Sequence, residues 1–225
     1  MFSEVETTTG PALERQETWR ERALGRSLSS ARDRSMARLE RFIPAARDLA
    51  NETGSAAFTV QQVVERAGLS LKSFYRSFGG KDALLLALLE EDSGIGAQIL
   101  SERIDQFDDP VDRMRGFVHG IFWMVSLPGV LGYVGVLVRE QRRLSEHHPA
   151  ELAQALAPLV DQLHRELETA MAHGVVRQAD AARDAATIFG LLLTAIHSIV
   201  VGAEPREPLE VAEYLWDFVW SGLEE

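Results

Sequence analysis

Apolar residues recur at intervals of three and four along most of this chain, and breakers rich in glycine, proline or aspartate interrupt that spacing. The uninterrupted segments are roughly 12 to 25 residues long, which is typical of helices. Alternating strand patterns are scarce. The one stretch with a strand-like composition, residues 130–138, would have no partner strand, so we expect a buried helix there. The sequence predicts an all-α fold with breaks at residues 93–94, 108–110, 127–129, 147–149, 174–180 and 202–208.

The composition narrows the class of protein further. The 225 residues include no cysteine, which excludes disulfides, thiolate metal sites and cysteine nucleophiles. The absence of cysteine is expected for a protein of a reducing compartment. The N-terminus lacks the pattern of a secretory signal, and no apolar run reaches the roughly 18 residues of a membrane helix. We therefore expect a cytoplasmic protein without a membrane partner.

Charge is divided unevenly along the chain. The net charge is −11, which taken alone argues against a nucleic-acid partner. Residues 1–81, however, hold 13 basic and 10 acidic side chains, a balance of +3, and residues 82–225 hold 10 and 24, a balance of −14. Both lysines, Lys72 and Lys81, lie in the basic part. This division favours an anion-binding head on an acidic body, although an accident of composition would give the same count.

The N-terminal third begins with a polar stretch. Residues 1–34 are rich in charged residues, serine and threonine, and are expected to form a mobile polar and basic tail. The spacing of apolar residues from 36 to 50 then indicates an amphipathic helix. Because Pro44 is tolerated only in a first helical turn, the packed helix should start near Arg41, after a separate or kinked piece.

Two short helices around a glycine turn come next. Thr59 supplies an N-cap hydroxyl and Gln62, three residues on, completes a capping box. Gly68 fits a left-handed turn, and Ser70 caps a second helix that ends at glycines 79–80. This arrangement is a helix-turn-helix, whose second helix can enter the major groove of DNA.

The outer face of the second helix carries hydrogen-bonding side chains. If Phe74 packs inward, the side chains around it turn outward, and these are types that bind bases or phosphates. The first N–H groups of the next helix would also favour a phosphate beside Lys81. The predicted DNA-binding residues are Thr59, Ser70, Lys72, Ser73, Tyr75, Arg76 and Lys81. Thr59 and Ser70 act as helix caps in either case, and Tyr75 could lie along the domain surface.

Residues 58–89, FTVQQVVERAGLSLKSFYRSFGGKDALLLALL, resemble the DNA-binding signature of the TetR family of transcriptional regulators. The resemblance implies a homodimer with a three-helix N-terminal DNA-binding domain, residues 35–81, joined through residues 81–91 to a ligand-binding and dimerisation domain, residues 92–225. It places Thr59 and Lys81 on phosphates. Ser70, Lys72 and Ser73 would lie near the groove floor or its edge, and Tyr75 and Arg76 on the DNA backbone or the bases. Pro44 and Leu71 depart from the family pattern, which favours polar residues there.

The acidic body contains a dense aromatic set. In a generic helical domain these side chains would form core. The resemblance implies a pocket among the middle helices, so we also expect a mostly apolar or aromatic ligand. The predicted lining residues are Phe117, Phe122, Trp123, Tyr133 and His164.

The last two helical segments carry wide apolar faces that need cover on two sides. Pairing with a symmetry mate would form an intersubunit four-helix bundle, as the resemblance implies, whereas an intramolecular core is the alternative. The predicted interface residues are Ile188, Leu191, Leu192, Ala195, Ile199, Val211, Leu215 and Phe218.

Enzyme and metal signatures are not recognisable in the sequence. His147 and His148 are adjacent and precede a proline, without further ligands at a suitable spacing, so we assign no metal and no cofactor. No catalytic motif is found. The resemblance therefore implies a ligand-responsive regulator, most simply a repressor that binds a pseudo-palindromic operator as a homodimer. The alternative is a helical ligand-binding or adaptor protein whose helix-turn-helix contacts protein.

Overall fold

The computed structural model describes residues 19–224, with side chains from residue 36 onward. This part of the chain consists of helices joined by short connections, without a strand, which confirms the predicted all-α class. The helices are α1 (Trp19–Thr53), α2 (Val60–Ala67), α3 (Leu71–Ser77), α4 (Lys81–Ile104), α5 (Pro110–Ser126), α6 (Val130–His147), α7 (Pro149–Ala172), α8 (Ala181–Val200) and α9 (Pro208–Leu223).

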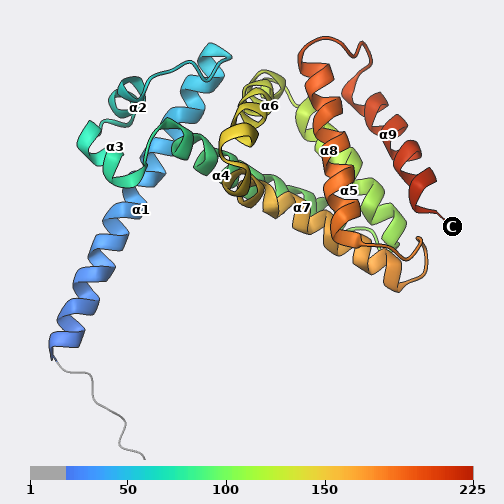
Figure 1. Cartoon of the computed structure of the whole chain (residues 1–225), viewed down its shortest axis with the longest axis horizontal. Helices are drawn as coiled ribbons and strands as arrows, with labels where there is room; N and C mark the ends of the chain where they lie inside the picture. The colour runs from blue at the N-terminus through green and yellow to red at the C-terminus, as the bar shows by residue number, and fades with distance from the viewer. Residues whose placement is uncertain (1–18, 225) are drawn as a thin grey trace, which may run out of the picture.

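The helices form two groups that share α4 (Figure 1). We call residues 19–91 the head and residues 92–224 the body. From residue 108 onward, the predicted breaks coincide with helix ends. Asp109 caps α5 by accepting hydrogen bonds from the N–H groups of Val111 and Asp112, and a proline stands in the first turn of α5, α7 and α9. Residues 130–138 lie within α6, so the prediction of a helix there is confirmed.

Helix α1 differs from the sequence prediction. Residues 1–18 of the predicted tail lie outside the described residues, but residues 19–34 are helical and continue without interruption into the packed part of α1. The first part of α1 projects away from the rest of the molecule (Figure 1). Pro44 sits inside the helix with its ring exposed, where it removes one backbone hydrogen bond. Burial of Phe42, Ala45 and Ala46 on the other face holds the helix together across this position.

Helix α4 also runs through an expected break. Residues 93–94 do not end a helix, and α4 continues to Ile104. Ser93 is buried, and a Cβ added at Gly96 would meet Leu159 at 3.7 Å and Met124 at 3.8 Å. The small side chains therefore let α7 and α5 pack closely on α4, and this tertiary packing outweighs the weak helix propensity of serine and glycine.

The core of the head extends into the body. Phe42 packs edge-to-face on Phe74 and Phe78, with ring centroids 5.5 and 5.9 Å apart. The same apolar cluster includes four leucines of α4 and reaches Val136 of α6 and Leu152 of α7. The predicted boundary after residue 91 therefore falls inside a continuous helix and beside a continuous core.

A half-buried ion pair fixes the far end of the body. Arg113 of α5 donates from Nε and Nη2 to Glu166 of α7, at 2.7 and 2.9 Å. Its Nη1 reaches the carbonyl oxygens of Ile104 and Phe107, and its Nη2 also reaches Asp105 at 3.1 Å. Since Glu166 is only 7% exposed, its carboxylate depends on this guanidinium for compensation.

We expect Arg113→Met to lower the free energy of unfolding by about 3–5 kcal/mol, because it leaves the Glu166 carboxylate buried without a partner. The double variant Arg113→Met/Glu166→Leu should recover most of this loss, since no charge is then stranded. Urea unfolding followed by circular dichroism measures both changes. A double variant no more stable than Arg113→Met would contradict this account of the pair.

Candidate nucleic-acid interface and ligand cavity

The helix-turn-helix has the local geometry that its capping residues dictate. The Thr59 hydroxyl accepts from the N–H of Gln62 at 3.2 Å, and the Gln62 side chain accepts from the N–H of Thr59 at 2.7 Å, completing the capping box. Gly68 turns the chain with φ 62°, and a Cβ there would lie 2.8 Å from Nη2 of Arg41. Ser70 caps α3 by accepting from the N–H of Ser73 at 3.1 Å.

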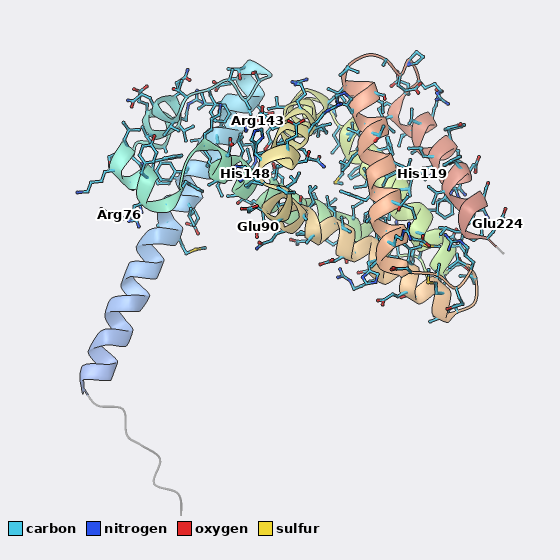
Figure 2. All side chains as sticks on the ribbon, in the orientation of Figure 1. Arg76, Glu90, His119, Arg143, His148 and Glu224 are labelled. Atoms are coloured by element: carbon cyan, nitrogen blue, oxygen red, sulfur yellow. The ribbon has the colours of Figure 1, made fainter. Side chains whose placement is uncertain are left out.

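Helix α3 presents polar side chains outward because its one buried residue anchors it. Phe74 is 0% exposed, and Tyr75 beside it is 61% exposed. Lys72 and Arg76 are also exposed, and neither forms an ion pair among residues 36–224. Figure 2 shows Arg76 at the outer edge of the head, away from the body. The arrangement leaves a cationic and aromatic surface free to meet a polyanion.

The remaining predicted DNA-binding residues lie around this surface. Thr59 and Ser70 are exposed and Ser73 is half-buried. Lys81 is more constrained, because its Nζ donates to the carbonyl oxygen of Ala56 and lies 4.8 Å from the ring centroid of Phe58. Burial lowers the pKa of Lys81. Lys81 thus ties α4 to the loop before α2, and its contact with phosphate stays a prediction.

A mostly apolar cavity of about 250 Å³ opens in the body between α4, α5, α6, α7 and α8. Of the five predicted ligand residues, only Tyr133 lines it. Phe117 and Phe122 are fully buried in the core, and Trp123 packs its ring against Arg103, with 4.4 Å between the guanidinium carbon and the ring centroid. His164 lies on α7, with its Nε2 3.5 Å from Glu168. The aromatic residues of α5 therefore build the body around the cavity, and their proposed ligand contacts remain untested.

The cavity wall also holds an acidic residue that the sequence analysis did not single out. Asp92 of α4 lines the cavity and accepts a hydrogen bond from the Tyr133 hydroxyl of α6 at Oδ2. Its Oδ1 accepts from Arg47 of α1, from Nη2 at 2.7 Å and from Nε at 3.2 Å. Burial raises the pKa of Asp92, and it raises the pKa of Tyr133 as well. One carboxylate thus joins the head, the shared helix and the body at the edge of the cavity.

The predicted dimer residues lie on α8 and α9 with different exposure. Ile188, Leu192, Val211 and Leu215 are buried within the chain itself. Leu191, Ala195 and Ile199 are partly buried, whereas Phe218 is 59% exposed. The outer faces of both helices, with Leu191 and Phe218, border a shallow hollow. The prediction therefore mixes residues that hold α8 and α9 to the body with residues that a partner could cover.

Comparison with known proteins agrees with this geometry. Residues 42–88 match the family model described as bacterial regulatory proteins, tetR family. No curated protein sequence matches the chain.

Among solved structures, the chain is similar to a TetR-family transcriptional regulator from Pectobacterium atrosepticum, with 22% identity, a TM-score of 0.68, and 86% of this chain and 97% of that chain covered. It is also similar to the regulator FadR from Bacillus subtilis, solved with stearoyl-CoA, with 17% identity, a TM-score of 0.63, and coverage of 81% and 98%. A third likeness is to RolR solved with resorcinol, with 17% identity, a TM-score of 0.65, and coverage of 85% and 89%.

The structure defines a class of all-α proteins. In this class the head carries a helix-turn-helix, a motif typical of DNA-binding proteins, and the helical body contains a cavity. The head segment matches the tetR family model over residues 42–88, and the fold of the whole chain is similar to that of TetR-family regulators.

We expect Ser70→Ala to lower the free energy of unfolding by about 1 kcal/mol, because the N–H of Ser73 then loses its cap. Ser70→Asp keeps a capping oxygen and should stay near the wild type. Lys72→Ala, two residues on, should change stability by less than about 0.5 kcal/mol because it is exposed and forms no ion pair in the described chain. Urea midpoints compare the three variants. Equal losses for Ser70→Ala and Ser70→Asp would refute the capping role.

Proposed function

We propose that this protein is a ligand-responsive transcriptional repressor that binds a pseudo-palindromic DNA operator as a homodimer. The observation that carries the proposal is the outer face of α3, where Lys72, Tyr75 and Arg76 are exposed while Phe74 anchors the helix. These side chain types hydrogen-bond to bases and phosphates, and a helix presented in this way fits the major groove. The family match supports the same conclusion.

Release of the operator would come from a small, mostly apolar ligand in the body cavity. The cavity wall supports this assignment, since apolar side chains dominate it and a few polar groups stand among them. Two structural neighbours were solved with stearoyl-CoA and with resorcinol, so related folds hold molecules with apolar parts. For release, the ligand must bind the DNA-free arrangement more tightly than the DNA-bound one.

Dimer formation through α8 and α9 accounts for the unusual surface of α8. By length and composition α8 could cross a membrane, and only 28% of its most apolar window is buried within the chain. It nevertheless packs on α6, α7 and α9 as part of the body. A second copy covering Leu191 and Phe218 would bury this surface in a cytoplasmic protein.

Selection of bound sequences from random duplex DNA tests the proposed function. We expect a two-fold motif with half-sites about one helical turn or slightly more apart. Tyr75→Ala, Lys72→Ala and Arg76→Ala should each weaken binding to the selected duplex. A lost base contact reduces the binding free energy by about 1–3 kcal/mol. A lost phosphate contact lowers the slope of log affinity against log salt concentration by about one unit. Fluorescence anisotropy over a salt series separates the two.

Arg142→Ala is the matched control, because it removes an exposed arginine of the same charge from α6 in the body. Its affinity for the duplex should equal that of the wild type. If protein refolded to strip bound ligand enriches no sequence at low salt, the repressor assignment fails and the adaptor alternative is favoured.

Phe218→Asp tests the dimer. We expect the wild type to sediment at twice the chain mass of 25.0 kDa and the variant at the chain mass, because a charge in an apolar interface has no partner there. Met36→Asp, at an apolar residue of α1 that is 49% exposed, serves as the control and should remain dimeric. A dimeric Phe218→Asp protein would remove this face from the interface.

A further inference from the structure

The carboxylate of Asp92 occupies an unusual position, at the wall of a mostly apolar cavity. Its side chain is 19% exposed, and the neighbouring lining residues include Ile95, Val134 and Leu137. A carboxylate without compensation is costly in such surroundings, so its hydrogen bonds are needed. They come from two elements that are distant in the sequence, α1 and α6.

The hydrogen bonds of Asp92 leave it able to bind a further donor. An ionised carboxylate has about four acceptor positions. Within the described chain, Arg47 uses two of them on Oδ1, and Tyr133 uses one on Oδ2. Oδ2 can therefore accept one more hydrogen bond, and Asp92 belongs to the cavity wall.

The charges around this position favour a cation over an anion. Arg47 is shared between Asp92 and Glu91, whose Oε2 lies 2.9 Å from Nη2 of Arg47. One guanidinium thus faces two carboxylates. A carboxylate or phosphate on the ligand would meet Asp92 across the apolar cavity and be repelled, whereas an ammonium group would be attracted and hydrogen-bonded.

Glu91 gives Arg47 a second partner. If a ligand cation takes Asp92, Arg47 keeps its ion pair with the more exposed Glu91 and is not left unpaired. A second cation on Asp92 would share its negative charge and so weaken the ion pair with Arg47, which is the only one in the described part of the chain that joins Arg47 of the head to a cavity residue. A ligand shifts an equilibrium only through such a difference in interactions between two states.

We propose that the cavity takes an apolar amine, whose ammonium group binds the open acceptor position on Oδ2 of Asp92 and weakens the pairing of this carboxylate with Arg47, and that this weakening transmits ligand binding to helix α1. The second part of this inference, the transmission to α1, rests on the proposed function. The ligand half stands on the cavity and Asp92 alone.

Three probes of equal chain length separate the effect of the ligand's charge from that of its apolar chain. They are decylamine, 1-decanol and decanoate, each used below its micelle concentration. Isothermal titration calorimetry on the full chain should show decylamine binding at least about tenfold more tightly than 1-decanol, and decanoate binding most weakly. Equal or tighter binding of 1-decanol or decanoate, or no binding by any probe, would overturn the ligand class.

Asp92→Asn should bring decylamine to the affinity of 1-decanol, while 1-decanol changes by less than about threefold. Glu90→Gln is the matched control, because it removes an exposed carboxylate from α4 that does not line the cavity. It should keep the preference for the amine. Tyr133→Phe retains the Asp92 carboxylate and removes a competing donor, so it should bind decylamine at least as tightly as the wild type. This variant decides the question if Asp92→Asn does not fold.

The transmission half is tested on the selected duplex. Decylamine should lower the affinity of the wild type for this DNA by about 5- to 150-fold, the usual range of coupling. Arg47→Met should still bind decylamine but lose most of this effect. Amine binding through Asp92 without any change in DNA affinity would overturn the transmission. A chain that enriches no duplex but binds the amine through Asp92 would refute the proposed function and support the ligand class.

Discussion

The structure depends on the apolar N-terminal half of α4 being covered from both sides. Leu84, Leu85 and Leu88 are almost fully buried, and their cluster combines Phe42 and Phe74 of the head with residues of α6 and α7. The head segment from Phe42 to the start of α4 is too short to bury a sufficient core alone, and the chain has no cysteine with which to brace it. The head is therefore held in place by its packing against α6 and α7 of the body.

Polar contacts lie along the same junction and make its geometry specific. Arg143 of α6 binds Asp82 at the start of α4, and the hydrogen bond from Arg143 lowers the pKa of Asp82. Arg139, one turn earlier on α6, donates to the carbonyl oxygen of Gly54 at 2.9 Å. Figure 2 shows Arg143 and His148 where α6 and α7 meet the head. Apolar packing provides most of the stabilisation, and these directional contacts select one orientation.

Local signals in the sequence predicted the helix-turn-helix well. Thr59, Gly68 and Ser70 act through atoms two or three residues away, so their identity determines the caps and the turn almost without regard to the rest of the chain. The prediction of helix ends was weaker where tertiary packing decides. The continuity of α1 through Pro44 and of α4 through Ser93 depends on partners elsewhere in the chain.

The cavity could not be predicted in the same way. Asp92 is 41 residues from Tyr133 and 45 residues from Arg47 in the chain. No periodic pattern in the sequence predicts that the three side chains meet. The aromatic residues of α5 were conspicuous in the sequence, but large rings are also what a helical body needs for its core, and Phe117 and Phe122 serve that purpose. Residue type alone does not distinguish a cavity-lining residue from a core residue. The difference depends on whether the neighbouring side chains fill the space beside it or leave it empty.

A cavity lined only by aliphatic side chains discriminates weakly among ligands, since one methylene group changes binding by only about 1–3 kcal/mol. A buried polar group changes this, because a ligand that fails to satisfy it leaves a desolvated charge behind. In this chain the group at the cavity wall is also the partner of Arg47 in the head. If the proposed amine binds here, selectivity for the ligand and the ion pair that reaches α1 would depend on the same carboxylate, so ligand binding would perturb this contact with α1.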